Sequence, residues 1–254
     1  MTINQQPAQT ELSTSSVSLK VSCVTGRGIY RDYWRHLDCY EQSHQELSTR
    51  PSKLRQWRSS AATGSQFVAR INPDVIPAMF SDQRGISSAS EAEIARSLSR
   101  VEALDASILM LHTPSSIRPS AEHERAVTTL RARLPEALPL AWRADGLWED
   151  SEQYFDLCAA HKIIPVIDPL MWDEEQPLPH GRHAYWKIMG GQGLTPRLGE
   201  YDLDKLLDLS DMWQSLAEEL TDESMSQPEP TLWVNFTATQ MFSAARRWRS
   251  TATR

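Results

Sequence analysis

Cysteine and long apolar runs are both scarce in this sequence, and each scarcity argues against a class of protein. Only three of the 254 residues are cysteines (Cys23, Cys39 and Cys158). An odd, dispersed set favours buried reduced thiols over a disulfide framework. The longest apolar runs, such as Ile163–Ile167, are about five residues, whereas a membrane-spanning helix needs about 20. No membrane-spanning segment is therefore expected.

An excess of basic residues is also missing, because 26 lysines and arginines face 33 aspartates and glutamates, for a formal net charge of -7. This balance disfavours a protein that coats nucleic acid, although it is compatible with a local basic cleft. The first residues, MTINQQPAQTELSTSS, lack the basic and then apolar pattern of a signal peptide, which predicts a cytoplasmic protein. Residues 1–18 are polar and aperiodic, so we expect a flexible tail before a single domain over 19–254.

Eight short segments have the apolar, β-branched or aromatic character of strands. They lie at 19–24, 37–42, 66–71, 107–112, 138–143, 163–168, 184–189 and 231–236. Between them, apolar residues recur at helical spacing. Helices are predicted at 51–60, 91–104, 120–134, 151–161, 203–220 and 240–250.

Polar residues mark where three of these helices begin. Ser90, Ser120 and either Asp150 or Ser151 stand at positions where a side-chain oxygen accepts from the first free backbone N–H groups. The stretches 72–90 and 170–182 are interrupted by proline, so we expect loops there, with room for a turn of helix.

Strands that alternate with helices along this length predict a (β/α)8 TIM barrel. The rival fold is an open, doubly wound sheet, which usually has a glycine-rich first turn. Here that turn, residues 25–28 (TGRG), lacks the third glycine of a dinucleotide site. We therefore expect no dinucleotide there, and the sequence identifies no other cofactor.

Short motifs accompany the predicted strands in a fixed order. They are 40–43 (YEQS), Pro51 and Ser52 with Trp57, 67–70 (FVAR), 112–116 (HTPSS), 141–143 (AWR) with Trp148, Asp168, 185–190 (YWKIMG) and 236–238 (FTA). In this order the sequence resembles the family called domain of unknown function 72, also known as the YecE-like proteins, over nearly the whole chain from residue 19. Known members of that family are TIM barrels, so the resemblance implies the same fold.

Several positions depart from the family pattern. Family members typically carry Glu where this chain has Ala141, His where it has Met189, and two Asn where it has Thr237 and Ala238. The residues that match in identity or charge are Glu41, Arg70, Arg143, Asp168 and Lys187. The resemblance therefore implies a divergent member.

A TIM barrel holds its functional residues at the C-terminal ends of its strands. Strand alternation puts Arg143 on the same face as Ala141, and Lys187 on the same face as Tyr185. Trp142 and Trp186 then lie on the opposite face, towards the helices. Cations and acids should then share one mouth, with Arg143, Lys187 and Asp168 converging and Glu41 across from them. The expected ligand-binding residues are Arg27, Arg70, Arg143 and Lys187, and the acid or base candidates are Glu41, His112 and Asp168.

A mouth with more cations than carboxylates predicts a site for an anion, because guanidinium groups offer paired donors to phosphate. The alternative is that Arg143–Asp168 and Arg70–Glu41 are structural ion pairs. For His112 the alternatives are a general base and a partly buried histidine at a strand end. A metal site built from His44, His112, His183, Glu41 and Asp168 has no known ligand spacing, so no metal is assigned.

Two classes of function remain open. One is an enzyme or binding barrel for a phosphate-bearing small molecule or nucleic-acid fragment, with Arg70, Arg143 and Lys187 as a clamp. The other is a catalytically degenerate binding or scaffolding protein, which Ala141 and Met189 suggest. The arginines around Trp248 indicate either a nucleic-acid patch or cations that complement a helix dipole; they are Arg246, Arg247, Arg249 and Arg254. The sequence does not indicate the oligomeric state.

Overall fold

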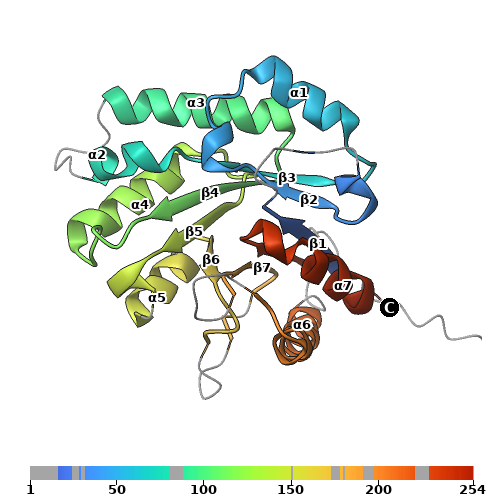
Figure 1. The fold of residues 1–254 in the computed structure, drawn as a ribbon. Helices are drawn as coiled ribbons and strands as arrows, with labels where there is room; N and C mark the ends of the chain where they lie inside the picture. Colours follow the sequence, from blue (N-terminus) through green and yellow to red (C-terminus); the bar gives the residue numbers. More distant parts are fainter. Residues whose placement is uncertain are drawn as a thin grey trace, which may run out of the picture.

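Eight short parallel strands form the centre of the molecule, and each lies where the sequence predicts a strand (Figure 1). The computed structural model describes residues 17–24, 29, 32–80, 88–149, 151–172, 178–179, 181–190, 197–220 and 229–253. Nearly all of the predicted tail, and Arg27, fall outside these residues. The strands are β1 (Ser18–Cys23), β2 (Cys39–Glu41), β3 (Gln66–Arg70), β4 (Ile108–Thr113), β5 (Leu140–Ala144), β6 (Ile163–Ile167), β7 (His183–Ile188) and β8 (Thr231–Phe236).

The strands follow the order β1-β8-β7-β6-β5-β4-β3-β2, and each pairs in parallel with the next. β1 and the start of β2 meet at the remaining seam, where Asp38 N donates to Val21 O at 3.3 Å. A sheet whose two edges meet is a barrel, and Figure 1 shows the helices outside it. The predicted (β/α)8 barrel is confirmed, and the open sheet is excluded.

Asp38 fastens this seam with its side chain as well as its backbone. Its Oδ1 accepts from Val21 N at 2.8 Å, and its Oδ2 accepts from Arg249 Nη2 at 3.0 Å. Arg249 also donates from Nη1 to His36 O at 3.0 Å. One carboxylate therefore ties β1, the start of β2 and the last helix together.

Seven α-helices lie among the described residues, and the six predicted helices are among them. They are α1 (Pro51–Ser60), α2 (Ile76–Phe80), α3 (Ser88–Leu104), α4 (Ala121–Arg133), α5 (Glu152–Ala160), α6 (Glu200–Glu219) and α7 (Phe242–Ala252). Ser120 and Ser151 cap α4 and α5 as predicted, by accepting from His123 N and Tyr154 N. The prediction for Ser90 is wrong, because α3 already begins at Ser88 and Ser90 is buried within it.

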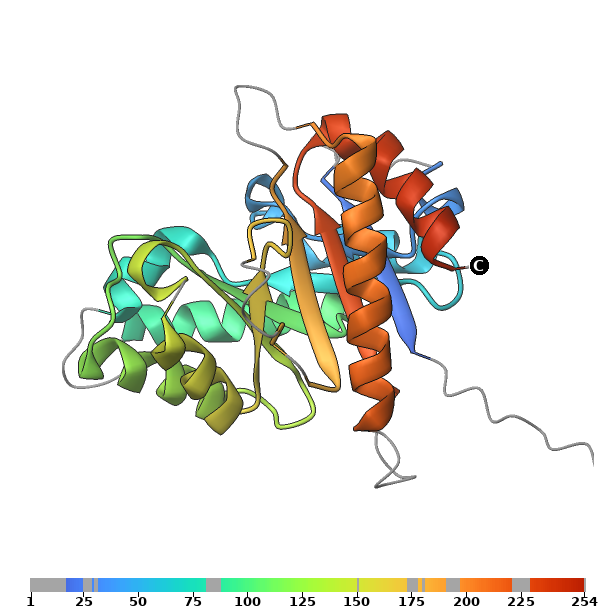
Figure 2. The same ribbon diagram turned by 90° about the horizontal axis from the view of Figure 1, so that it is seen from below.

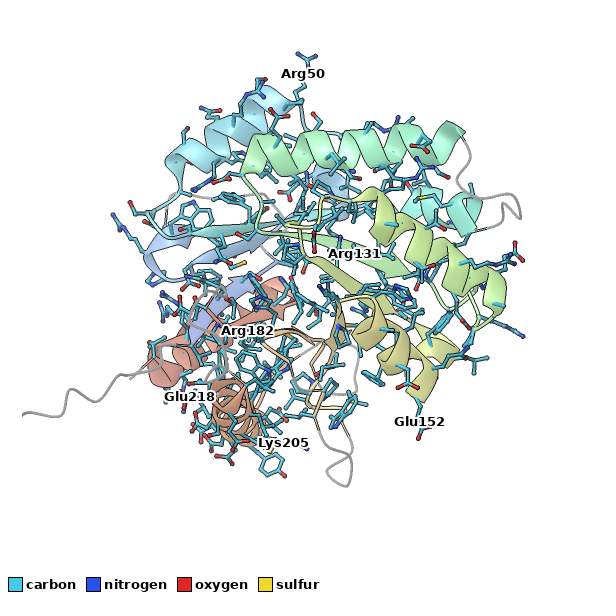
Figure 3. All side chains as sticks on the ribbon, turned by 180° about the vertical axis from the view of Figure 1, so that it is seen from behind. Arg50, Arg131, Glu152, Arg182, Lys205 and Glu218 are labelled. Carbon is cyan, nitrogen blue, oxygen red and sulfur yellow. The ribbon has the colours of Figure 1, made fainter. Side chains whose placement is uncertain are left out.

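The barrel separates two apolar cores. The inner one is built from strand residues that face the axis: Cys39, Val68, Ile108, Met110, Ala141, Ile164, Val166, Tyr185 and Trp233. The outer one contains Trp142 and Trp186 and lies between strands and helices, where Figure 3 shows side chains filling the space. The predicted register of β5 and β7 is therefore correct, and Arg143 and Lys187 follow Ala141 and Tyr185 on the inward face. The three cysteines are free and buried, as expected.

The ring of helices is incomplete among the described residues, since only a 3-10 turn (Tyr33–Arg35) lies between β1 and β2. Figure 2 shows α6, which is 20 residues long, beside α7 on one side of the barrel. Between β6 and β7 the described residues contain no helix, although a (β/α)8 barrel usually has one after each strand. No helix of the described residues has the length and apolar character needed to cross a membrane.

Replacing Asp38 by alanine should lower the free energy of unfolding by about 1–3 kcal/mol, because Val21 N and the Arg249 guanidinium would lose a charged acceptor. Urea denaturation measures the loss. Asp32→Ala is the control, since its exposed ion pair with Arg35 should contribute under about 0.5 kcal/mol. Equal effects of the two substitutions would show that Asp38 does not fasten the seam.

Candidate functional site

The C-terminal mouth of the barrel gathers most of the charged residues expected there. Glu41, Arg70, Arg143 and Lys187 are strand residues that face inward near the ends of β2, β3, β5 and β7. His112 lies at the same level on β4, and Asp168 directly follows β6. Below them the inner apolar core fills the barrel, so its side chains close the bottom of the mouth.

Glu41 is the most deeply buried carboxylate of the mouth, with 5% of the residue exposed. Lys187 Nζ donates to its Oε1 at 2.7 Å, and the Tyr185 hydroxyl donates to its Oε2 at 2.6 Å. Arg70 Nη1 lies 3.5 Å from Oε1. The predicted pair between Arg70 and Glu41 therefore exists, and Lys187 converges on Glu41 across the barrel rather than on Asp168.

The charges of this cluster stabilise one another. Burial raises the pKa of Glu41, but Lys187, Arg70 and the hydrogen bonds from Lys187 and Tyr185 outweigh it, so the pKa lies at about 2. Burial lowers the pKa of Lys187 to about 8, despite the nearby Glu41 carboxylate. Glu41 is thus ionised near neutral pH, and this charge state suits a counter-ion better than a general acid.

A second cluster forms around Asp145, which was not among the residues predicted for the mouth. His112 Nε2 lies 2.8 Å from Asp145 Oδ2, and Arg143 Nε donates to Oδ1 at 3.1 Å. Burial raises the pKa of Asp145, but the hydrogen bonds and charges of His112 and Arg143 hold it below its usual range. Asp145 lies one residue beyond the end of β5, at the start of the next loop, so strand alternation alone does not place it at the mouth.

Asp168 does not form the predicted ion pair with Arg143, whose carboxylate partner among the described residues is Asp145. Asp168 instead accepts backbone hydrogen bonds from Leu170 N at 3.1 Å and Met189 N at 2.8 Å. Burial raises the pKa of Asp168 above its usual range, although Arg143 and the two backbone donors oppose this. Asp168 therefore joins the loops after β6 and β7.

The two arginines of the mouth are incompletely paired. Arg70 Nη2 is 3.5 Å from His112 Nδ1, and no acceptor among the described residues lies within hydrogen-bonding distance of the buried Arg70 Nε. Arg143 Nη1 donates to Met189 Sδ at 3.1 Å, and a thioether sulfur is a weak acceptor. The side chains of Arg70 and Arg143 are 13% and 14% exposed; Arg70 Nε is buried, whereas the contact between Arg143 Nη1 and Met189 is open to solvent.

The described residues of the mouth show no excess of cations, and the fourth predicted cation, Arg27, lies outside them. Arg70, Arg143 and Lys187 face the carboxylates of Glu41, Asp145 and Asp168, so the charges balance when His112 is neutral. The incompletely bonded donors, and not the net charge, are therefore what distinguishes this mouth.

Two histidines considered for a metal site lie elsewhere. His44 pairs with Asp74 in an exposed contact at 3.2 Å. His183 is the first residue of β7, at the end of the barrel opposite the mouth. Within the described part of the chain, no three His, Cys, Asp or Glu residues are grouped as metal ligands.

Two of the arginines near the C-terminus contact other parts of the fold, and Arg246 is exposed. Arg247 pairs with Glu200 of α6 at 3.2 Å, and Arg249 binds Asp38 at the seam. Trp248 is buried in the outer core. Arg254 lies outside the described residues. These contacts favour a structural role for this segment over a nucleic-acid patch.

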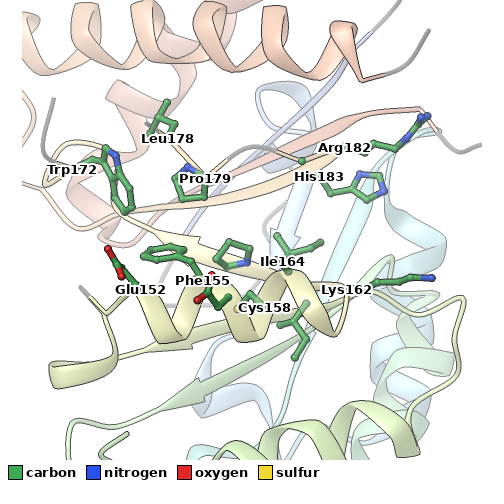
Figure 4. Close-up of a pocket in the computed structure, with 15 residues that line it drawn as sticks. Glu152, Phe155, Cys158, Lys162, Ile164, Trp172, Leu178, Pro179, Arg182 and His183 are labelled. Carbon is green, nitrogen blue, oxygen red and sulfur yellow. The ribbon is translucent and has the colours of Figure 1, made fainter. Parts of the chain in front are cut away.

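A groove of about 910 Å³ lies on the outside of the barrel beside β6, where the ring of helices is open (Figure 4). Phe155 of α5 and Trp172 form one end of it, with their rings perpendicular and their centroids 5.3 Å apart. Lys162 and Arg182 lie at the other end. None of the described mouth residues lines this groove, so it is separate from the mouth.

The fold and the mouth together define a (β/α)8 barrel with buried, coupled charges at its C-terminal opening. A scan against protein-family models finds no match, and a search of curated proteins finds no similar sequence.

Solved structures do resemble the chain. A DUF72 family protein of Enterococcus faecalis superposes with a TM-score of 0.69 at 11% identity, over 94% of this chain and 98% of that chain. A DUF72 family protein of Thermotoga maritima superposes with a TM-score of 0.68 at 13% identity, over 93% and 100%. At these identities the likeness establishes the fold. DUF72 is the family whose motif order the sequence resembles.

Glu41→Gln should lower the free energy of unfolding by about 3–5 kcal/mol at neutral pH, because Lys187 and Arg70 would remain buried without their counter-ion. The depressed pKa of Glu41 stabilises the folded state above about pH 4.5, and this contribution is lost as the pH falls towards 2. Urea denaturation at pH 5 and pH 3 should therefore show a smaller loss for the variant than for the wild type. Glu91→Gln, at an exposed ion pair, is the control. Parallel pH profiles of the wild type and Glu41→Gln would contradict this assignment.

Gly146 fixes the loop that carries Asp145. It has φ +75°, and a Cβ built there would lie 2.8 Å from Ser115 Cβ. Gly64 has φ +79°, and a Cβ built there would have no heavy atom within 4 Å. Its substitution therefore measures the cost of the backbone conformation without a steric clash. Gly64→Ala should cost about 1 kcal/mol, and Gly146→Ala about 2–4 kcal/mol, in unfolding free energy. Equal losses of unfolding free energy would mean that Ser115 moves aside for the new Cβ at no energetic cost.

Proposed function

We propose that the protein binds a small phosphate-bearing anion at the C-terminal mouth, with Arg70 and Arg143 as its principal donors. One observation carries the proposal: the buried Arg70 Nε has no hydrogen-bond partner among the described residues, and the nearby Arg143 Nη1 contacts only the weak acceptor Met189 Sδ. A buried donor is costly until it is hydrogen-bonded, and an anion that enters the mouth supplies the missing acceptors.

Phosphate suits this arrangement for two reasons. A guanidinium group presents planar, paired donors that match two oxygens of one phosphate. Lys187 adds positive charge on the inner side of the mouth, while Glu41 and Asp145 hold the three cations in place. A nucleic-acid fragment with a terminal phosphate presents the same oxygens, and we favour the small molecule because Arg247 and Arg249 of the C-terminal segment already pair with acids of the fold.

His112 is the group best placed for proton transfer to such a ligand. Asp145 holds its Nε2, and its Nδ1 faces the Arg70 guanidinium, so the ring lies between the two proposed anion donors. This geometry supports an acid or base role for His112 and leaves Glu41 as a counter-ion. The alternative, a catalytically degenerate barrel that acts as a binding or scaffolding protein, is supported by Ala141 and Met189 in place of the family's Glu and His.

We also propose that the chain is a divergent relative of the DUF72 family and acts in the cytoplasm. The motif order and the shared fold support the first proposal. Three buried, free cysteines are compatible with the second, since such thiols suit a reducing compartment.

Arg143→Ala should weaken phosphate binding by about 1.5–3 kcal/mol, the range of a charge-assisted hydrogen bond, with a smaller effect on stability. Isothermal titration calorimetry with inorganic phosphate measures the affinity, and urea denaturation measures the stability. Arg133→Ala is the control, because that exposed side chain pairs with Glu91 on the helix layer. A large loss of stability with unchanged phosphate affinity would make Arg143 a structural ion-pair member.

A further inference from the structure

We infer that the ligand of the mouth is an amphiphilic anion, an organic phosphate whose apolar group contacts Leu147, Met171 and Met189. This inference rests on the proposed function and narrows its ligand class. These three residues, called the rim below, follow β5, β6 and β7, which are neighbouring strands in Figure 1, and Met189 contacts Arg143.

Exposure singles out the rim. The large apolar residues exposed within the described chain are Leu147, Met171, Met189, Tyr201, Met212 and Leu220. Three of these six closely follow adjacent strands at the mouth, and Leu147 and Met171 are 66% and 63% exposed. Isolated exposed apolar side chains are ordinary on a protein surface, but several of them beside polar groups at the strand ends of a barrel are typical of a binding site.

Contacts connect the rim to the proposed anion donor. Met189 Sδ lies 3.1 Å from Arg143 Nη1, so one rim residue touches the guanidinium directly. Asp168 connects the loop that carries Met171 to Met189. Its backbone O accepts a hydrogen bond from Met171 N at 3.0 Å, and its Oδ2 accepts one from Met189 N at 2.8 Å. Met171 and Met189 are therefore held on either side of one aspartate.

Leu147 is positioned from β5. It lies two residues after Asp145, which pairs with Arg143 at 3.1 Å, and directly after Gly146, whose close approach to Ser115 fixes the turn. Trp148, the next residue, is buried in the outer core, so the short helix Gly146–Trp148 presents Leu147 outward.

The chemistry of the ligand follows from this arrangement. An inorganic phosphate would satisfy the guanidinium donors but leave the rim in water. A phosphate monoester places its oxygens at Arg70 and Arg143 and covers part of the rim with its apolar substituent. Methionine suits such a contact, because its flexible and polarisable side chain adapts to the shape of the substituent.

The test compares inorganic phosphate with phenyl phosphate by isothermal titration calorimetry on the full chain. Phenyl phosphate should bind about tenfold more tightly, the gain expected when roughly 55 Å² of apolar surface leaves water. Met171→Gln and Leu147→Gln should each lower that preference about two- to threefold while leaving inorganic phosphate affinity unchanged. Both side chains are exposed, so the variants should fold as the wild type does.

Met212→Gln on α6 is the matched control, since it makes the same change at an exposed position within a helix and should leave the preference intact. Equal affinity for the two phosphates, or a preference that the rim variants do not alter, would overturn the inference while leaving the proposed function standing. Failure of both phosphates to bind a folded protein would overturn the proposed function and the inference with it.

Discussion

The buried Glu41 carboxylate joins β2 to β7 across the barrel, and the charged groups of the mouth are arranged around it. A carboxylate in this position is stable only with close partners, and Lys187, Tyr185 and Arg70 provide them. Because Lys187 and Tyr185 lie two residues apart on one face of β7, a single strand supplies both hydrogen bonds. The network sits directly on the inner apolar core, so it limits how far that core extends towards the mouth.

Arg70 connects Glu41 and its partners to the other charged residues of the mouth. One of its nitrogens faces Glu41 and another faces His112, which in turn contacts Asp145, the partner of Arg143. In this network the positive and negative charges are equal in number, but not every donor is well bonded. Both arginines keep N–H donors without a strong acceptor among the described residues. The proposed anion site therefore rests on these hydrogen-bond donors and not on an overall positive field, which a net charge of -7 does not suggest.

Periodicity in the sequence is sufficient to predict the barrel and the register of its strands. Trp142 and Trp186 alternate with residues that face the axis, so the pattern of residues alone assigns one face of each strand to the helices. Local hydrogen bonding is harder to predict. Ser90 has the character of a helix cap, yet α3 starts two residues earlier. The choice of Asp145 over Asp168 as the partner of Arg143 depends on how the loop after β5 turns, and strand alternation does not specify that turn.

The central claim is that Arg70 and Arg143 together hold an anion at the mouth. A crystal of the protein soaked with tungstate, a heavy analogue of phosphate, tests it most directly, because anomalous scattering locates the metal atom without bias. The account predicts one strong site within hydrogen-bonding reach of both guanidinium groups, and its loss in Arg143→Ala crystals. Tungstate bound only on the outer surface or along α7, with the mouth empty, would contradict it.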